Sequence, residues 1–442
     1  MIKLKLKKYL FSHFFQSVSL SLFARAIGIF NILIIIPLII NNYTTEEFAV
    51  FSILTQFITI YGFLDLGIGS ILINEIIYYR SKKYIKIIRT VVFQLIKFLS
   101  VLALILLGIF LLINYFFGLE LLFKDIDEEL LVSLSDNFPL LCGLFFVILP
   151  TTLIQKIQFG FLDNSIFHIS EIVQKSLQIL LIYFLVKYDS SIVDIIFYYY
   201  LAILVTNFIN ILLYFFIIRK DVFRNKKVIK KLYIPSLIKK SIFYFLGSIF
   251  FFFSRTIDTY LISIYGSYDI LKDYEIIKRP FDIGLTTLMV ITSVLWPILA
   301  EAHHKKEFKK IKKLLNTTII GVFLAMILLS LLMVAIGDEI LQLWIGDDTI
   351  SYQTLVYVLA GSVFLLYGVG NVLITYLNSI SVFYVQLVVY VILAFIGIPI
   401  KIYTLSNYGL SGYLAALIVI LALVYVIPMY FISNKKINKN LA

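Results

Sequence analysis

The chain has 442 residues, of which 61% are hydrophobic and 14% charged, and its formal net charge is +12 at pH 7. Soluble domains are about 45–50% apolar and about 25% charged, so this composition excludes the soluble enzyme classes and is typical of a membrane protein. In such a protein a positive balance indicates topology before it indicates nucleic-acid binding.

Twelve apolar segments predict an all-α polytopic membrane protein, because each is long enough for a transmembrane helix. They lie near residues 17–40, 48–78, 90–117, 136–158, 166–186, 195–218, 241–265, 276–300, 314–336, 351–377, 382–402 and 411–432. The segment at 48–78 is too long for one straight span. Gly67 and Gly69 within it favour a kink or close helix packing.

Basic residues are concentrated in alternate loops between these segments. One set of loops holds 27 Lys/Arg and 4 Asp/Glu, whereas the other holds 3 Lys/Arg and 16 Asp/Glu. Because positively charged short loops stay in the cytoplasm, we expect both termini to be cytoplasmic. Membrane topology thus explains the excess of basic over acidic residues. No nucleic-acid partner is expected, and the cytoplasmic lysines are suited to contact anionic membrane lipids.

The two halves of the chain resemble each other. A shift of 226 residues brings Glu75 onto Glu301, each at the exit of a span and each followed by a basic loop. Repeats of the same orientation are related by an axis along the membrane normal, and their interface is the expected binding site. The predicted parts are an N-terminal six-helix lobe at 1–218, a basic cytoplasmic linker at 219–240, a C-terminal six-helix lobe at 241–432 and a cytoplasmic tail at 433–442.

Fourteen charged residues fall inside the predicted spans. Each costs about 2.5–3.5 kcal/mol at a helix centre, so we expect the deep ones to face a protein interior or a water-filled cavity. Four of them lie near enough to span ends to snorkel or cap a helix, namely Glu75, Lys97, Asp136 and Lys401.

The sharpest pattern lies at 166–186, where polar residues follow the i, i+3, i+4, i+7 rule and predict a polar stripe along one helix face. The stripe consists of His168, Glu171, Gln174, Lys175 and Gln178. Glu171 and Lys175, four residues apart, can also pair with each other.

Two further spans repeat a charge pattern in which an arginine precedes an aspartate by three residues. The pairs are Arg255 with Asp258 and Arg279 with Asp282. A second polar face follows Tyr367, Asn371, Thr375 and Asn378. Together these faces indicate a hydrated central cavity. The alternative is a set of interhelical ion pairs that only hold the bundle together.

Enzymatic constellations are missing from the sequence. His303 and His304 are adjacent and cannot present two metal ligands on one helix face, and there is neither a Walker A nor a G-x-S-x-G motif. Cys142 is a single cysteine in an apolar segment, which favours a small core residue. We therefore expect no catalytic residues, no metal and no cofactor.

Five short motifs resemble those of bacterial polysaccharide transporters, the Wzx-type O-antigen flippases of the multidrug/oligosaccharidyl-lipid/polysaccharide exporter superfamily. The motifs are Phe23–Gly28 (FARAIG), Tyr43–Phe48 (YTTEEF), Phe63–Gly69 (FLDLGIG), Leu343–Gly346 (LWIG) and Asn407–Gly412 (NYGLSG). The resemblance implies a MATE-like fold of two six-helix lobes in the bacterial inner membrane. It also implies flipping of an undecaprenyl-diphosphate-linked oligosaccharide to the periplasmic leaflet by alternating access.

The resemblance further implies cationic contacts for the pyrophosphate. It assigns this role to Arg25, and less directly to Arg255, Lys278 and Arg279; we add Lys175 from the polar stripe. An arginine fork matches the oxygens of a phosphate and keeps its charge when buried. Coupling or cavity candidates are Asp65, Glu171, Asp258, Asp282 and Asn371.

Other functions remain open at this stage. A drug/cation antiporter of the same superfamily is the main alternative, and a membrane glycan polymerase or ligase is the second; a purely structural protein is the third. Basic residues outnumber acidic ones among the deep positions, which favours an anionic substrate. We expect a monomer that works with a polysaccharide polymerase and chain-length machinery. We also expect the export of its substrate to depend on the proton gradient.

Overall fold

The computed structural model describes residues 2–64, 67–119, 122–124, 126–220, 222, 234–380 and 382–438. Within these ranges every regular element is a helix, as the all-α prediction requires. The chain divides into two compact units, Met1–Phe245 and Leu246–Ala442. Asp65 and most of the linker predicted at 219–240 lie outside the described residues.

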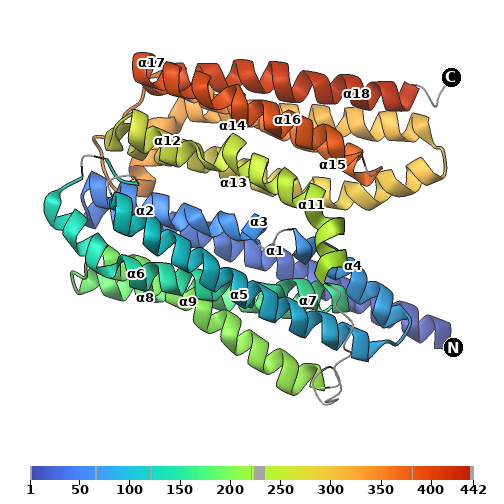
Figure 1. Ribbon diagram of the computed structural model, residues 1–442. Coiled ribbons are helices and arrows are strands. Elements are labelled where there is room, and N and C mark those ends of the chain that lie inside the picture. Colours follow the sequence, from blue (N-terminus) through green and yellow to red (C-terminus); the bar gives the residue numbers. More distant parts are fainter. Residues whose placement is uncertain are drawn as a thin grey trace. The chain divides into compact units, whose positions relative to one another are not determined.

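Unit 1 is a helical bundle in which α1 packs along α8, α4 against α7, and α6 between α5 and α9. Figure 1 shows α5, α6 and α9 running side by side. Its elements are α1 (Ile2–Asn42), α2 (Thr45–Gln56), η1 (Phe57–Ile60), α3 (Tyr61–Leu64), α4 (Ile68–Ser81), α5 (Ile85–Phe117), α6 (Glu128–Thr151), α7 (Leu153–Phe161), α8 (Asn164–Lys187), α9 (Ile192–Leu213), the π-helix η3 (Tyr214–Ile218) and the first part of α11 (Ile234–Phe251).

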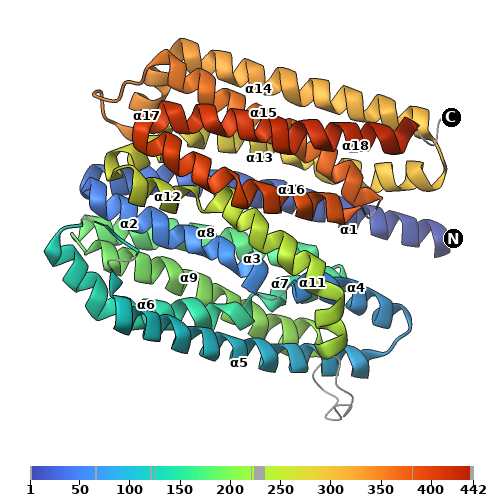
Figure 2. The same cartoon turned by 45° about the horizontal axis from the view of Figure 1, so that its top comes forward.

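Unit 2 is built around α15, which packs against α13, α14 and α17 (Figure 2). Beyond the end of α11 its elements are the π-helix η4 (Phe252–Thr256), α12 (Asp258–Tyr265), α13 (Tyr268–His304), α14 (Phe308–Ile345), α15 (Thr354–Ser379), α16 (Phe383–Phe395), α17 (Gly397–Ile420), the π-helix η5 (Leu421–Val426) and α18 (Ile427–Asn438).

Eight helices of the described chain are long and apolar enough to cross a membrane, or nine if the bent pair Phe245–Thr256 and Asp258–Tyr265 is one span. The last of them, Tyr384–Asn438, is 55 residues long and contains most of two predicted spans. The predicted spans at 48–78 and 276–300 are not among them: the first is divided into shorter helices, and the second lies in α13 with its charges. These differences account for the gap between the nine spans found among the described residues and the twelve predicted from the sequence.

The break in the segment at 48–78 lies at a glycine. Gly67 adopts a left-handed conformation with φ of 68° immediately before α4 begins at Ile68. Glycine takes this conformation without the steric penalty that a β-carbon adds. The kink predicted from the two glycines is thus confirmed, and this segment is divided into α2, η1, α3 and α4.

The motif at Tyr43–Phe48 has a structural role at the start of α2. The side chain of Thr44 accepts a hydrogen bond from the Glu47 amide, and the Glu47 carboxylate accepts one from the Thr44 amide at 2.8 Å. This is a capping box, which satisfies two backbone donors that a helix start leaves unpaired. The Tyr43 hydroxyl donates to the Ser190 carbonyl at 2.6 Å and so ties this start to the turn before α9.

Both units contain a turn in which a non-glycine residue of positive φ donates its amide to the carbonyl three residues before it; unit 1 also has this turn at Leu162 and Asp189. Between α4 and α5, Lys83 has φ of 60° and its amide donates to the Arg80 carbonyl at 2.9 Å. Between α13 and α14, Lys306 has φ of 58° and its amide donates to the His303 carbonyl at 3.0 Å. These lysines are 223 residues apart, so the 226-residue shift is three residues too long at this turn.

Candidate functional site

Unit 1 contains a polar cavity of about 330 Å³. Helices α7, α8 and α9 supply most of its polar lining, which includes Gln155, Lys156, Glu171, Gln174, Lys175, Asn207 and Asn210. Of the residues predicted for binding or coupling, the cavity brings together Glu171 and Lys175. Lys156, which the sequence placed only among the charges within spans, lies beside them.

The stripe on α8 divides between the cavity and the protein interior. Glu171, Gln174 and Lys175 line the cavity, as predicted from their spacing. Gln178 is fully buried and donates to the Tyr199 carbonyl at 3.2 Å. Glu171 and Lys175, which their spacing allows to pair, do not pair in this structure: the Glu171 Oε2 atom lies 3.5 Å from the Nδ1 atom of His168 instead.

Both cavity lysines keep their charge available. Within the described part of the chain, the ammonium groups of Lys156 and Lys175 form no hydrogen bond and no ion pair. The contact that Lys175 does make is through its backbone carbonyl, which accepts from the Asn31 amide at 3.1 Å. Unpaired cations facing a polar cavity inside a membrane protein indicate a ligand or ion pathway.

Amide side chains fix the opposite wall of the cavity. The Gln158 amide donates to Asn210 at 2.7 Å, and the Asn207 amide donates to the Thr151 hydroxyl at 3.0 Å. These bonds join α7 to α9 and α6 to α9. Because the amides are held by their neighbours, the cavity has a preformed polar wall and needs little reordering to accept a polar group.

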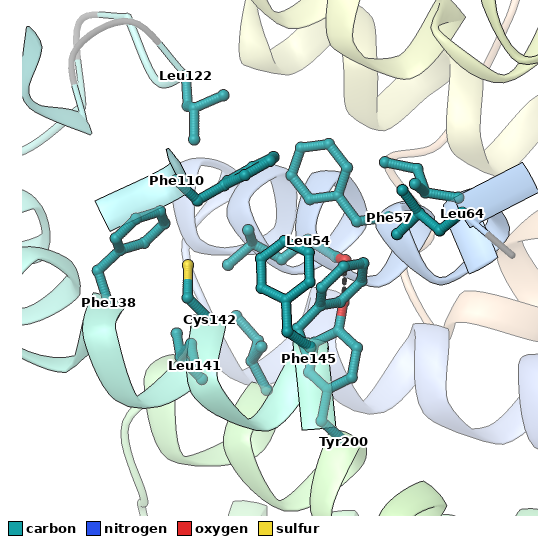
Figure 3. Close-up of a pocket in the computed structure, with 13 residues that line it drawn as sticks. Leu54, Phe57, Leu64, Phe110, Leu122, Phe138, Leu141, Cys142, Phe145 and Tyr200 are labelled. Carbon is teal, nitrogen blue, oxygen red and sulfur yellow. Dashed lines mark hydrogen bonds between the residues drawn. The ribbon is translucent and has the colours of Figure 1, made fainter. Parts of the chain in front are cut away.

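A second pocket of unit 1 has the opposite character. Figure 3 shows Phe110, Phe138, Phe145 and Cys142 around a pocket of about 80 Å³. The Tyr200 hydroxyl donates to the Leu54 carbonyl, so even this polar group is satisfied within the protein. Cys142 is buried and free, which fits its predicted place in the core. The pocket offers no charged group to a headgroup.

The other predicted residues of unit 1 are Arg25 and Asp65. Arg25 is half-buried on α1 and is not part of the cavity lining. Asp65 lies outside the described residues. The cationic wall of the cavity is therefore formed by lysines of α7 and α8, where the resemblance implied an arginine of the first span.

In unit 2 the predicted arginine–aspartate pairs exchange partners. Arg255 on η4 lies 3.6 Å from Asp282 on α13, and its guanidinium lies 4.3 Å from the centroid of the Tyr367 ring. The expectation that Arg255 has Asp258, three residues away, as its partner is wrong. The π-helical turn at 252–256 alters the register of this helix, so α-helical spacing does not hold across it.

Asp258 instead binds a lysine from another helix. Lys401 of α17 donates to the Asp258 carboxylate at 2.7 Å and to the Ser254 carbonyl at 2.7 Å. Lys401 was expected to snorkel near a span end, but it is 1% exposed. The π-helix η4 supplies the carbonyl oxygen, because at its end the regular backbone hydrogen bonding changes register.

A carboxylate counted with the outer loops pairs with the two remaining cations. Glu275 is 1% exposed in α13 and forms ion pairs with Lys278 and Arg279. It also accepts a hydrogen bond from Thr259 at 2.9 Å. Two basic residues follow Glu275 at i+3 and i+4. This spacing identifies Glu275 as their pairing residue once α13 is extended by one residue beyond the predicted span.

The polar face predicted on α15 is partly used for packing. Asn371 donates to the Thr292 hydroxyl at 3.3 Å, and the Thr375 hydroxyl bonds to the Asn371 carbonyl at 2.8 Å. Every predicted binding or coupling residue of unit 2 therefore has a partner in the protein. The ion-pair alternative describes this unit, whereas the cavity prediction describes unit 1.

Comparison with known proteins is consistent with this architecture. The family model described as polysaccharide biosynthesis protein matches residues 15–303, and the MatE model matches residues 244–403. No curated protein matches the sequence.

Solved structures match over nearly the whole chain. An inward-facing multidrug resistance MATE family transporter of the MOP superfamily has a TM-score of 0.72 and 13% identity, covering 93% of this chain and 95% of that chain. A mutant of the MATE transporter VcmN of Vibrio cholerae has a TM-score of 0.66, 14% identity and 98% coverage of both chains. A MOP superfamily transporter from Pyrococcus furiosus has a TM-score of 0.62 and 13% identity, covering 97% of this chain and 94% of that chain.

The family match covers well over half of the residues, and the two-unit helical fold is that of MATE transporters. The chain therefore belongs to the polysaccharide biosynthesis protein family and is a multi-pass membrane protein with the fold of MATE transporters.

Proposed function

We propose that this transporter flips an undecaprenyl-diphosphate-linked oligosaccharide, such as an O-antigen repeat unit, across a bacterial inner membrane. The observation that carries the proposal is the unit 1 cavity, where the ammonium groups of Lys156 and Lys175 have no partner among the described residues. A diphosphate diester carries two negative charges, which these two lysines match. Charge-assisted hydrogen bonds to phosphate oxygens are among the stronger polar interactions in proteins.

The polyprenyl tail needs no site in the protein. It remains in the lipid, and only the headgroup has to leave water and cross through a polar cavity. The volume of about 330 Å³ accommodates a diphosphate and part of a sugar, within the usual size range of ligand pockets. The carrier then exposes this cavity first to the cytoplasmic side and afterwards to the periplasmic side.

Export of a cationic drug is the alternative suggested by the multidrug transporters among the structural neighbours. A cationic substrate needs an uncompensated carboxylate. In unit 2, Asp258 and Asp282 are paired with Lys401 and Arg255, and in unit 1 Glu171 faces His168. The arrangement of charges therefore favours the anionic substrate.

Reconstituted vesicles distinguish the two substrates. We expect purified protein to translocate a fluorescent polyprenyl-diphosphate oligosaccharide, measured by the access of an external glycosidase, and not to transport ethidium. Lys156→Met combined with Lys175→Met should reduce glycan translocation at least about tenfold, because two charge-assisted contacts are lost. Lys187→Met is the matched control, since Lys187 is exposed at the end of α8. Ethidium transport without glycan translocation would contradict the proposal.

The direction of transport requires the predicted topology, with both termini in the cytoplasm. A maleimide reagent added outside intact cells should label Asp127→Cys and not Lys227→Cys. Asp127 is the N-cap residue of α6, whereas Lys227 lies in the basic linker outside the described residues. The native Cys142 is buried and contributes little labelling. The opposite labelling pattern would reverse the proposed orientation.

Coupling to the proton gradient completes the proposal. Of the carboxylates considered for coupling, Asp258 and Asp282 are neutralised by basic partners, which leaves Glu171 as the best placed among the described residues. We expect a protonophore to slow glycan export in energised vesicles. Export at an unchanged rate would exclude proton coupling and leave flipping itself intact.

A further inference from the structure

Three side chains on α8 form a line from the protein interior into the cavity. His168, Glu171 and Lys175 follow one another at i+3 and i+4 spacing. The Glu171 Oε2 atom lies 3.5 Å from His168 Nδ1, and the side chains of His168 and Glu171 are 15% and 34% exposed. Since residues three and four apart on a helix are both neighbours, Glu171 can reach either His168 or Lys175.

The present contact leaves two groups available. The Nδ1 atom of His168 is buried and forms no hydrogen bond, because 3.5 Å is long for one. The Lys175 ammonium has no partner in the part of the chain that the structure describes. Imidazole is the side chain that commonly changes charge between pH 5 and 8, whereas a lysine facing water stays charged. The proton on the imidazole therefore decides which neighbour attracts the carboxylate more strongly.

We infer that protonation of His168 holds Glu171 away from Lys175 and so raises the affinity of the unit 1 cavity for a diphosphate anion. This inference rests on the proposed function, since it concerns the same cavity. When His168 is charged, it binds Glu171, and Lys175 is free to bind the anion. When His168 is neutral, Glu171 moves to Lys175 and competes with the anion for its charge.

The charged groups on the neighbouring elements do not reproduce this switch. Helix α7 supplies Lys156, and α1 supplies Arg25. The only charged residue of α9 is Asp194, bound to Ser191 at the helix start, and Asp163 before α8 is bound to Arg219 at 2.6 Å. None of these charged side chains on the neighbouring elements is an imidazole.

Thermodynamic linkage between proton binding and anion binding fixes the sign of the effect of each on the other. If protonation strengthens anion binding, anion binding must strengthen protonation by the same factor. The proton is therefore taken up together with the anion. This switch sets the affinity for substrate; it does not by itself exchange a proton for substrate, which requires the opposite sign.

The test measures binding of dimethyl diphosphate, esterified once on each phosphorus, to the purified protein by calorimetry. This probe keeps both charges at about pH 5.5 and about pH 7.5, which bracket the usual imidazole range. We expect the wild-type protein to bind it about tenfold more tightly at the lower pH, the equivalent of one favourable charge contact. His168→Asn should bind equally at both pH values, at the weaker level.

Glu171→Gln provides the opposite variant. With no carboxylate to compete for Lys175, we expect tight binding at both pH values, which a merely structural role of Glu171 would not produce. Binding that is unaffected by pH in the wild-type protein, or an unchanged pH dependence in His168→Asn, would overturn the switch and leave the proposed function standing. Absence of binding at both pH values in every variant would overturn both.

Discussion

The two units treat buried charge in opposite ways although they share the same turn at Lys83 and at Lys306. Among the described residues, unit 1 has no partner for the ammonium groups of Lys156 and Lys175 around its cavity. Unit 2 pairs its deep cations with carboxylates, two of the cations sharing one carboxylate. Charge in an apolar environment is tolerated either by neutralisation or by exposure to a polar cavity, and the repeat uses one solution in each half.

This difference has a consequence for function. In unit 2 each deep cation already contacts a carboxylate, so offering it to a ligand means breaking a pair, and breaking a buried pair is costly. An unpaired lysine at a cavity has already been desolvated in part, and binding an anion relieves that cost. The proposed headgroup recognition is therefore assigned to unit 1, and the unit 2 network is interpreted as the support that holds η4, α12, α13 and α17 together.

The largest effect is expected for the most buried pair. Lys401→Met leaves Asp258 without its cation, so the free energy of unfolding should fall by about 3–5 kcal/mol. Thermal unfolding in detergent measures the loss. The double variant with Asp258→Leu should recover most of the stability, because no buried charge remains. If Lys401→Met is as stable as the wild-type protein but inactive, unit 2 takes part in transport directly.

One lysine substitution in each unit tests whether the two units differ in binding and in stability. Lys175→Met should weaken diphosphate binding by about 1.5–3 kcal/mol, as loss of a charge-assisted contact, with little change in stability. Lys278→Met should do the reverse: it removes one partner of Glu275 and lowers stability by about 1–3 kcal/mol without changing affinity. Equal effects of both substitutions on binding would erase the distinction between the units.

The sequence allowed much of unit 1 to be predicted for a physical reason. The stripe from His168 to Gln178 lies on a single regular helix, where side-chain positions follow from the helical repeat alone. Glu171 and Lys175 therefore face one cavity as expected. What spacing could not supply was the preference of Glu171 for His168, since both neighbours are within its reach.

Unit 2 was harder to predict because its pairs join distant segments. Lys401 and Asp258 are 143 residues apart, and no local pattern specifies such a contact. Glu275 was assigned to an outer loop because hydropathy falls before residue 276. The helix nevertheless starts earlier, at Tyr268, where the Ser267 hydroxyl caps it by accepting from the Ile270 amide. Hydropathy defines the apolar span and misses the polar end of the helix.

Arg25 is the position at which the family resemblance and the cavity geometry differ. If it contacts the pyrophosphate, Arg25→Ala should abolish surface glycan, as detected by glycan staining of cells, while the protein remains inserted in the membrane. A bidentate arginine–phosphate contact is worth about 1.5–3 kcal/mol, comparable to the contribution of one cavity lysine. Normal surface glycan in Arg25→Ala cells would leave recognition to Lys156 and Lys175.

The smallest expected effect concerns the stacking of Arg255 on Tyr367 in unit 2. The guanidinium lies 4.3 Å from the ring centroid, so Tyr367→Leu should lower stability by about 0.5–2 kcal/mol. Glycan translocation should then stay at the wild-type rate, because the arginine keeps Asp282 as its partner. Tyr367→Phe is the matched control and should retain both properties, since the ring face remains. Reduced translocation in Tyr367→Leu at unchanged stability would assign Arg255 to the substrate path and make both units parts of one binding site.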